Sequence, residues 1–384
     1  MKQFPQLVAS TALVLALAGC SDDLSRPTQE LLDPSLNSAG EGRAGNVYTT
    51  SNASSGNAVL VFDRQTDGTL TAAGSFGTAG NGSGAGLGNQ GALVLSDEGR
   101  WLLAVNAGSN SVAAFRVQSD GSLERTSTVA SGGVKPISVT ISGNLVYVLN
   151  AGGVENISGF RLSSSGVLSS ISGSARPLSG TGVGPAQIGF AQHGRVLIVT
   201  EKTTNRITTY RIGTDGLASA PQPQASHGTT PFGFSLSHSN LLIVSEAFGG
   251  AVDASATSSY TVGENGVLHL ISGSVPTTET AACWVVITKN GRFAYVTNTG
   301  SGSVSGYSVQ SGALALLDPN GRTGVTGAGS TPIDMSLSRD SRFLFALNSG
   351  TGTLSGFAVE ASGGLTPIGT TTGIPTVASG LAAR

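Results

Sequence analysis

The chain has 384 residues, of which 56 are glycine, 39% are apolar and 11% are charged. Glycine is roughly twice as frequent as usual, yet there is no collagen-like period, and the apolar content is too high for a disordered chain. The formal net charge of −2 without any run of like charges argues against nucleic acid or an anionic membrane surface as the main partner. An all-β protein with many tight turns remains as the explanation for the glycine content.

The first 20 residues have the pattern of a secretory signal, with Lys2 near the start, an apolar stretch at 7–17 and small residues before Cys20. The stretch is too short for a transmembrane helix. The sequence Leu-Ala-Gly-Cys at 17–20 resembles a bacterial lipoprotein lipobox, in which the cysteine becomes the acylated N-terminus. The alternative is an ordinary signal peptide with a chance cysteine.

The lipobox predicts a signal peptide at 1–19 and lipidation at Cys20, which would place the protein in the bacterial cell envelope. By resemblance to the usual sorting rule, Ser21 favours the outer membrane. Residues 20–45 are polar and rich in glycine and proline, so we expect a flexible tether between the lipid and the fold.

From residue 46 onward, a unit of roughly 50 residues recurs, with three or four short apolar strands separated by polar turns. One residue closes the second strand of each unit, and it recurs seven times at intervals of 44 to 54 residues, at Asn52, Asn106, Asn150, Glu201, Glu246, Asn298 and Asn348. A single unit could not bury both of its faces, but radially stacked units cover each other. We therefore predict an all-β, seven-bladed β-propeller over 46–384.

The two ends of this region indicate how the ring closes. Residues 46–50 match a second strand, so the first unit lacks its innermost strand. The chain ends with a segment at 374–381 that looks like a first strand without a blade of its own. We expect this segment to complete blade one.

The repeated motifs Asp/Asn-Gly-Arg-x-Leu-x-Val-x-Asn-x-Gly-Ser and Val-x-x-Phe/Tyr-x-Val-x-x-Asp-Gly-x-Leu resemble the seven-bladed lactonase family, which includes bacterial 6-phosphogluconolactonase and the fungal carboxymuconate lactonizing enzyme. The lactonizing enzymes use a glutamate at the end of a second strand, together with an arginine and a histidine at the starts of first strands. The resemblance implies that Glu201 is the catalytic residue. The arginine position falls at 185–187 and the histidine position at 135–137, and neither segment contains the expected residue.

In a propeller, the fourth-to-first and second-to-third connections meet around one end of the central channel, which is the default ligand site. By this rule Lys135, His227, Glu246 and Arg322 lie on the same side as Glu201, and we expect them to bind substrate. The carboxylates of Glu201 and Glu246 close adjacent blades, so they could serve as acid and base or hold a cation. The alternative is that both only bond turn amides, as the asparagines at equivalent positions would.

Other motifs indicate little chemistry. His193 and His238 fall in first-to-second turns and therefore on the opposite face, and Cys283 is expected to be a buried, inert thiol. The glycine-rich tract at 80–88 leads into a strand, so we expect a flexible inter-blade loop and not a nucleotide site. The sequence has no Cys-x-x-Cys, metal-spaced Cys/His cluster or Gly-x-Ser-x-Gly elbow, so we expect no metal and no cofactor.

Two functions remain open. The first is a lactonase-like enzyme that hydrolyses or forms a small lactone, or acts as a cycloisomerase, at the channel mouth. The second is a non-catalytic propeller that binds or scaffolds an envelope ligand. The expected partners are a small-molecule lactone or an envelope ligand, with no nucleic acid, membrane contact only through the lipid anchor, and a monomeric chain.

Overall fold

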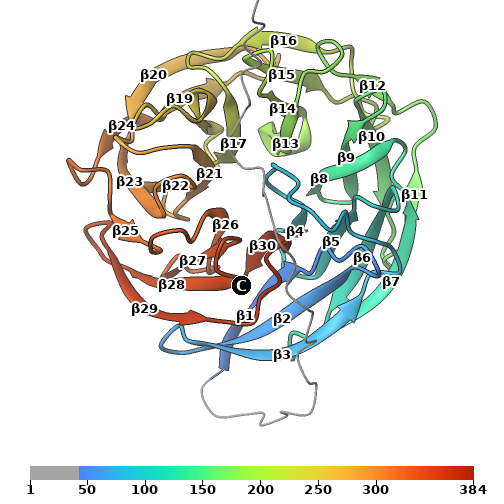
Figure 1. Ribbon diagram of the computed structural model, residues 1–384. Helices are drawn as coiled ribbons and strands as arrows, with labels where there is room; N and C mark the ends of the chain where they lie inside the picture. Colours follow the sequence, from blue (N-terminus) through green and yellow to red (C-terminus); the bar gives the residue numbers. More distant parts are fainter. Residues whose placement is uncertain (1–42) are drawn as a thin grey trace, which may run out of the picture.

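The computed structural model describes residues 43–384, which form seven antiparallel sheets arranged radially around a central axis (Figure 1). The predicted seven-bladed β-propeller is confirmed. The expected signal peptide, Cys20 and most of the expected tether lie outside the described residues. The first strand begins at Arg43, slightly before the expected start of the propeller.

The same four-strand order recurs in every sheet, with the first strand of the blade innermost, and blades three and six have one additional short strand that pairs with the third. Blade one contains β30 (Ser379–Ala383), β1 (Arg43–Thr50), β2 (Ala58–Gln65) and β3 (Leu70–Gly77). Blade two contains β4 (Leu93–Leu95), β5 (Trp101–Asn106), β6 (Ser111–Val117) and β7 (Leu123–Ala130). Blade three contains β8 (Val134–Ser142), β9 (Leu145–Gly152), β10 (Asn156–Leu162), β11 (Leu168–Ser170) and β12 (Arg176–Pro177).

The remaining blades follow the same plan, with two short 3₁₀ turns, η1 (Gln192–Gly194) and η2 (Phe248–Gly250). Blade four contains β13 (Pro185–Ala191), β14 (Val196–Glu201), β15 (Arg206–Arg211) and β16 (Gln222–Ala225). Blade five contains β17 (Pro231–Leu236), β18 (Leu241–Glu246), β19 (Ala256–Val262) and β20 (Leu268–Pro276). Blade six contains β21 (Ala282–Ile287), β22 (Phe293–Asn298), β23 (Ser303–Gln310), β24 (Ala313–Leu316) and β25 (Gly324–Val325). Blade seven contains β26 (Pro332–Leu337), β27 (Phe343–Asn348), β28 (Thr353–Val359) and β29 (Leu365–Thr371).

The ring closes as the sequence predicts, because β30 pairs antiparallel with β1 and supplies the innermost strand of blade one. In Figure 1 the red β30 lies beside the blue β1 at the centre of the ring. The hydroxyl of Thr49 donates a 2.7 Å hydrogen bond to the Gly380 carbonyl, which adds a side-chain contact to the strand pairing. The first and last segments of the propeller are therefore parts of one sheet.

The core lies between the blades. Every residue of the second strand β5 is buried, because both faces of a blade are covered by its neighbours. Leu103 on β5 packs in one apolar cluster with Val139 and Val148 of the next blade. Stability is thus distributed over interfaces between consecutive sheets.

Glycines in the third-to-fourth turns allow these interfaces to be close. Each blade has one at positive φ against the preceding blade, namely Gly68, Gly121, Gly166, Gly216, Gly266, Gly312 and Gly363. At Gly216, with φ of +85°, an added Cβ would lie 2.6 Å from Nη2 of Arg161. The hydroxyl of Tyr147 donates a 2.8 Å hydrogen bond to the Gly216 carbonyl. Much of the glycine excess therefore reflects turns that must fit against a neighbouring blade.

Candidate functional site

The mouth of the channel, where the fourth-to-first connections enter the inner strands, is filled by side chains. Phe232 at the start of β17 and Trp284 near the start of β21 are 2% and 1% exposed. Their ring centroids are 5.3 Å apart, with an interplanar angle of 57°. Cys283, buried as expected, and Ala186 complete this apolar cluster. The mouth thus contains packed hydrophobic side chains where a ligand would have to enter.

The connection between β3 and β4, residues 78–92, covers this cluster. Trp284 Nε1 donates a 2.6 Å hydrogen bond to the Asn89 carbonyl, and Gln90 Nε2 donates one of 2.9 Å to the Val285 carbonyl. The Gln90 main-chain nitrogen also donates to the Ala186 carbonyl at 3.2 Å. The connection, which runs from blade one to blade two, therefore also forms hydrogen bonds with blades four and six.

This arrangement corrects the expectation for the glycine-rich tract at 80–88. The tract is an inter-blade connection, but it is not a free loop, because the Gly82 and Gly84 nitrogens donate hydrogen bonds of 2.8 and 2.9 Å to the Ala53 and Asn52 carbonyls. Asn89 and Gln90, which follow the tract, are 3% and 8% exposed. Asn89 Nδ2 also donates to the Ile137 carbonyl of blade three. Glycines permit the close main-chain approaches, since a Cβ at Gly82 would lie 2.1 Å from the Asn52 carbonyl carbon.

Lys202 is the cation that reaches the covered mouth. Its Nζ donates a 2.6 Å hydrogen bond to the Gly88 carbonyl and lies 4.5 Å from the Phe232 ring centroid. A cation over an aromatic face is held electrostatically. The lysine thus joins blade four to the covering connection, whereas the preceding Glu201 points elsewhere.

Glu201, the expected catalytic residue, is fully buried, and its carboxylate is saturated with hydrogen bonds. Oε1 accepts from the Ser179 main-chain nitrogen at 3.0 Å and from Thr208 Oγ1 at 2.8 Å. Oε2 accepts from the Ser179 hydroxyl and from Thr204 Oγ1 at 3.1 Å. The carboxylate therefore ties the connection before β13 to the β14–β15 hairpin, and no face of it is open to a ligand.

Glu246 has the same environment in blade five. Its Oε1 accepts a 2.8 Å hydrogen bond from the Gly228 main-chain nitrogen and another from the Ser258 hydroxyl, and Oε2 accepts one of 2.7 Å from Ser274. The side chain is also fully buried. This geometry matches the alternative in which both glutamates bond turn groups.

In four other blades the asparagine at the equivalent position bonds the adjoining strand as a donor, whereas Asn52 in blade one bonds the connection after β3. Asn298 Nδ2 donates to Ser303 Oγ at 3.1 Å and to Ser305 Oγ at 2.8 Å on the adjoining strand. In blade four the hydroxyl of Thr208 donates to Glu201 instead. Because a serine or threonine hydroxyl both donates and accepts, either asparagine or glutamate can hold the hairpin.

The other expected binding residues each have separate local partners. Lys135 is exposed, and its main-chain nitrogen bonds Asn110 Oδ1 at 2.8 Å. His227 lies over the outer strand β20, since a Cβ at Gly273 would lie 2.4 Å from its Nε2. Within residues 43–384, no hydrogen bond or ion pair joins Lys135 or His227 to Glu201.

Arg322 forms an ion pair with Glu279, which lies in the connection that enters blade six. Its Nε donates a 2.6 Å hydrogen bond to Oε1 of Glu279, whose side chain is 3% exposed compared with 53% for Arg322. This bond and the carboxylate charge raise the pKa of Arg322. The structure therefore does not gather the expected substrate-binding set around one point.

The opposite end of the channel is hollow. A cavity of about 380 Å³ opens among the inner strands of blades two to six, and Gln90 separates it from the filled mouth. Its polar lining includes Ser142, Gln187 and Ser235. His193 and His238 lie at its rim, on the face that the sequence predicts. The concavity of the channel thus lies at the end remote from the expected active site.

Within residues 43–384, no cluster of three or more histidine, cysteine, aspartate or glutamate side chains is positioned to hold a metal ion. Over the same range, no helix is both long and apolar enough to cross a membrane.

A family model described as "Lactonase, 7-bladed beta-propeller" matches residues 46–181 and 251–379, which is more than half of the chain. The chain belongs to the seven-bladed β-propeller lactonase family. The matched ranges omit 182–250, the segment that contains Glu201, His227 and Glu246. No curated protein matches the chain.

Solved structures share the lactonase-family fold. A protein from Lactobacillus plantarum is 18% identical, with 89% of this chain and 99% of that one covered and a TM-score of 0.70. A candidate 6-phosphogluconolactonase from Bacteroides uniformis is 16% identical, with coverage of 88% and 99% and a TM-score of 0.69. The periplasmic gluconolactonase PpgL of Pseudomonas aeruginosa is 17% identical, with coverage of 88% and 98% and a TM-score of 0.67.

Sequence reasoning missed the residues that close the mouth of this lactonase-family propeller. Phe232 and Trp284 could have been noticed as the largest side chains near the starts of their inner strands. Nothing local marks Asn89 and Gln90, because their partners lie in other blades. Only the assembled ring shows that these four side chains meet.

Proposed function

We propose that this lactonase-family propeller is a lipid-anchored binding protein of the bacterial cell envelope that does not act on lactones at the channel mouth. The observation that carries the proposal is the saturated, fully buried carboxylate of Glu201. A general acid or base must come within hydrogen-bond reach of the reacting group. Glu201 cannot do so without releasing both Ser179 and the hydroxyls of its own hairpin.

The closed mouth supports the same proposal. A substrate entering there would have to displace the Asn89 carbonyl from Trp284 and the Gly88 carbonyl from Lys202. Each such group, once buried and unpaired, costs about 1–3 kcal/mol. The 78–92 connection therefore opposes access to the apolar cluster beneath it.

The hollow end of the channel is the better candidate for binding a small molecule. Its volume of about 380 Å³ is within the range of ligand pockets. Hydroxyl and amide groups of Ser142, Gln187 and Ser235 line it, and such groups favour a small polar ligand that can exchange hydrogen bonds. We therefore assign the proposed binding role to this end.

Lactone turnover is the second candidate, and membership of the lactonase family favours it. The test is hydrolysis of glucono-δ-lactone and 6-phosphogluconolactone by the wild-type chain and by Glu201→Gln, with Glu360→Gln, an exposed glutamate in blade seven, as the matched control. We expect no rate above buffer from any of the three proteins. Hydrolysis by wild type and Glu360→Gln that falls at least tenfold in Glu201→Gln would replace the binding role by catalysis.

The lipid anchor is tested separately. Cys20 in the lipobox motif supports acylation, and cells given a labelled fatty acid should transfer the label to the wild-type protein but not to Cys20→Ala. Label on both proteins, or on neither, would remove the anchor from the proposal. The Cys283→Ala protein is the matched control and should still carry label, because Cys283 is buried.

A further inference from the structure

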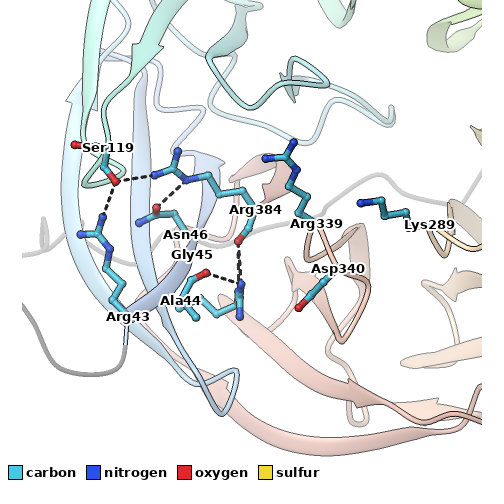
Figure 2. Close-up of a pocket in the computed structure, with 10 residues that line it drawn as sticks. Arg43, Ala44, Gly45, Asn46, Ser119, Lys289, Arg339, Asp340 and Arg384 are labelled. Carbon is cyan, nitrogen blue, oxygen red and sulfur yellow. Dashed lines mark hydrogen bonds between the residues drawn. The ribbon is translucent and has the colours of Figure 1, made fainter.

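A second concavity lies on the face of the first-to-second and third-to-fourth turns, over the seam where β30 closes the ring. It has a volume of about 590 Å³ and draws residues from four blades (Figure 2). Five basic side chains line it, which are Arg43, Arg64, Lys289, Arg339 and Arg384. We call this concavity the basic groove.

The charge in the basic groove is exceptional for this chain. Only 20 lysines and arginines occur in 384 residues, so a quarter of them line one groove. Asp340 is the one carboxylate side chain in the lining, and Asp63 lies 3.6 Å from Arg43. A main-chain carboxylate at Arg384 would add at most one negative charge, so a cationic excess remains in a protein of net negative charge. Such an excess attracts anions to that surface.

Three of the cations are oriented mainly by carbonyl and amide oxygens, although Arg43 is also ion-paired with Asp63 and Arg64 also donates to the main-chain oxygen of Arg384. Nη2 of Arg64, a residue that is 5% exposed, donates to the Ala44 carbonyl at 2.9 Å. Nε of Arg384 donates to Asn46 Oδ1 at 3.0 Å, and Nη2 of Arg43 donates to the Ser119 carbonyl at 3.4 Å. Carbonyl and amide oxygens orient a guanidinium without cancelling its charge. The wall of the groove is therefore a built array of positive charge.

The other two cations are free to meet a ligand. Within residues 43–384, neither Lys289 Nζ nor the Arg339 guanidinium has a carboxylate within 4.0 Å. Both residues are exposed in the first-to-second turns of blades six and seven. Figure 2 shows Arg339 next to Arg384 and Lys289 on the far side of Arg339, with no dashed line from either to the other residues drawn.

We propose that the basic groove binds a ligand carrying multiple phosphate charges. A single monovalent anion would leave most of this positive charge uncompensated, whereas a phosphate group brings up to two charges and three acceptor oxygens. The planar fork of Arg339 suits two phosphate oxygens, and Lys289 adds a point charge beside it. The groove lies on the face opposite the mouth, so the site is independent of whether the mouth is catalytic.

Phosphate of this kind could come from a soluble polyphosphate or from a lipid headgroup. Calorimetric titration of the full chain in neutral detergent, first with tripolyphosphate and then with soluble dihexanoyl phosphatidic acid, separates the two sources. We expect saturable binding of at least one probe, which weakens as salt is added. The probe that binds with the higher affinity identifies the source. If neither probe binds, the proposal is overturned.

Matched variants locate the binding. The double variant Lys289→Ala/Arg339→Ala should bind phosphate about tenfold or more weakly than wild type, since each of the two substitutions removes an unpaired charge from the groove. Arg206→Ala/Arg211→Ala removes the same charge from exposed positions of blade four and should change affinity by less than about twofold. An equal loss in both double variants would show only a general charge effect and overturn the site. Citrate bound as tightly as either phosphate would overturn the phosphate assignment.

Discussion

The indole nitrogen of Trp284 donates a 2.6 Å hydrogen bond to the main-chain oxygen of Asn89, 195 residues earlier in the chain. This bond joins the inner strand of blade six to the connection that enters blade two. It closes the channel at the end where lactonase-family catalysis is expected. The same connection forms the roof of the hollow at the other end through Gln90.

Replacing Trp284 by phenylalanine should isolate this hydrogen bond. The ring can still pack on Phe232, but the Asn89 carbonyl loses its donor, so we expect a loss of about 1–3 kcal/mol in the free energy of unfolding measured by urea denaturation. Trp101→Phe is the matched control, because the Trp101 ring packs between blades two and three beneath two arginines and its indole nitrogen donates no hydrogen bond within residues 43–384. Equal losses in the two variants would contradict a specific role for the Trp284 bond.

The hydrogen bonds that the Glu201 carboxylate accepts predict that replacing this residue lowers stability. Glutamine presents a donor where the carboxylate accepts from Thr204 and Ser179, so Glu201→Gln should lose about 1–3 kcal/mol of unfolding free energy. The exposed Glu360→Gln variant should stay within about 0.5 kcal/mol of wild type. A Glu201→Gln protein as stable as wild type would show that the clamp contributes nothing.

Asp334 on β26 predicts a pH dependence. Burial raises the pKa of Asp334 well above 3.8, although amides of Met335 and of β30 partly offset this effect. Below the unfolded-state pKa both states are protonated, and as pH rises the unfolded state releases its proton first, so the folded protein loses stability. Asp334→Asn should therefore be more stable than wild type at pH 7, and the difference should shrink as the pH falls and vanish below about pH 4.

Denaturation measured across this pH range checks the prediction for Asp334. Asp97→Asn, in an exposed turn of blade two, is the control and should stay within about 0.5 kcal/mol of wild type, as surface substitutions usually do. A difference for Asp334→Asn that grows toward acid pH would have the wrong sign and would refute the argument.

The inter-blade fit can be tested at Gly216. An alanine there must adopt a φ of +85° and place its Cβ 2.6 Å from Arg161 Nη2, whereas Gly99→Ala meets a similar φ of +69° with no atom within 4 Å. In both variants the strained backbone conformation should lower the free energy of unfolding by about 1 kcal/mol. Gly216→Ala should lose more stability than Gly99→Ala. The additional decrease in melting temperature measures the cost of the contact between the new Cβ and Arg161. Identical melting temperatures would show that Arg161 yields without cost.

The last strand predicts the behaviour of a truncated protein. Deleting residues 374–384 removes β30 and with it the inner strand of blade one, so we expect cooperative unfolding to be lost. Differential scanning calorimetry should show a broad, reduced transition in place of the wild-type peak. A truncated protein that melts with the wild-type peak would mean that β30 is dispensable for closure.

The fold could be predicted because its signals are local. Strand alternation, the Asp-Gly turns and the spacing of residues such as Asn106 and Asn298 recur within each unit. Closure by the C-terminal segment followed from counting strands, although the closing strand lies at Ser379–Ala383, later than the predicted 374–381. The glutamates were correctly placed at the ends of second strands, as Glu201 and Glu246 show, but their orientation was not predictable. That orientation depends on Ser179 and Gly228, which reach the carboxylates from separate connections.

The sequence by itself determined the number of blades and the seam, because each depends on residues close together in the chain or on a repeated period, and it predicted an export signal outside the described residues. Only the tertiary structure decided that Asn89 and Trp284 close the mouth, and that Arg64, Lys289 and Arg339 line one groove. These residues lie far apart in the sequence and in different blades, so no local pattern relates them. Their meeting depends on how closing the ring places each blade against the channel and against its neighbours.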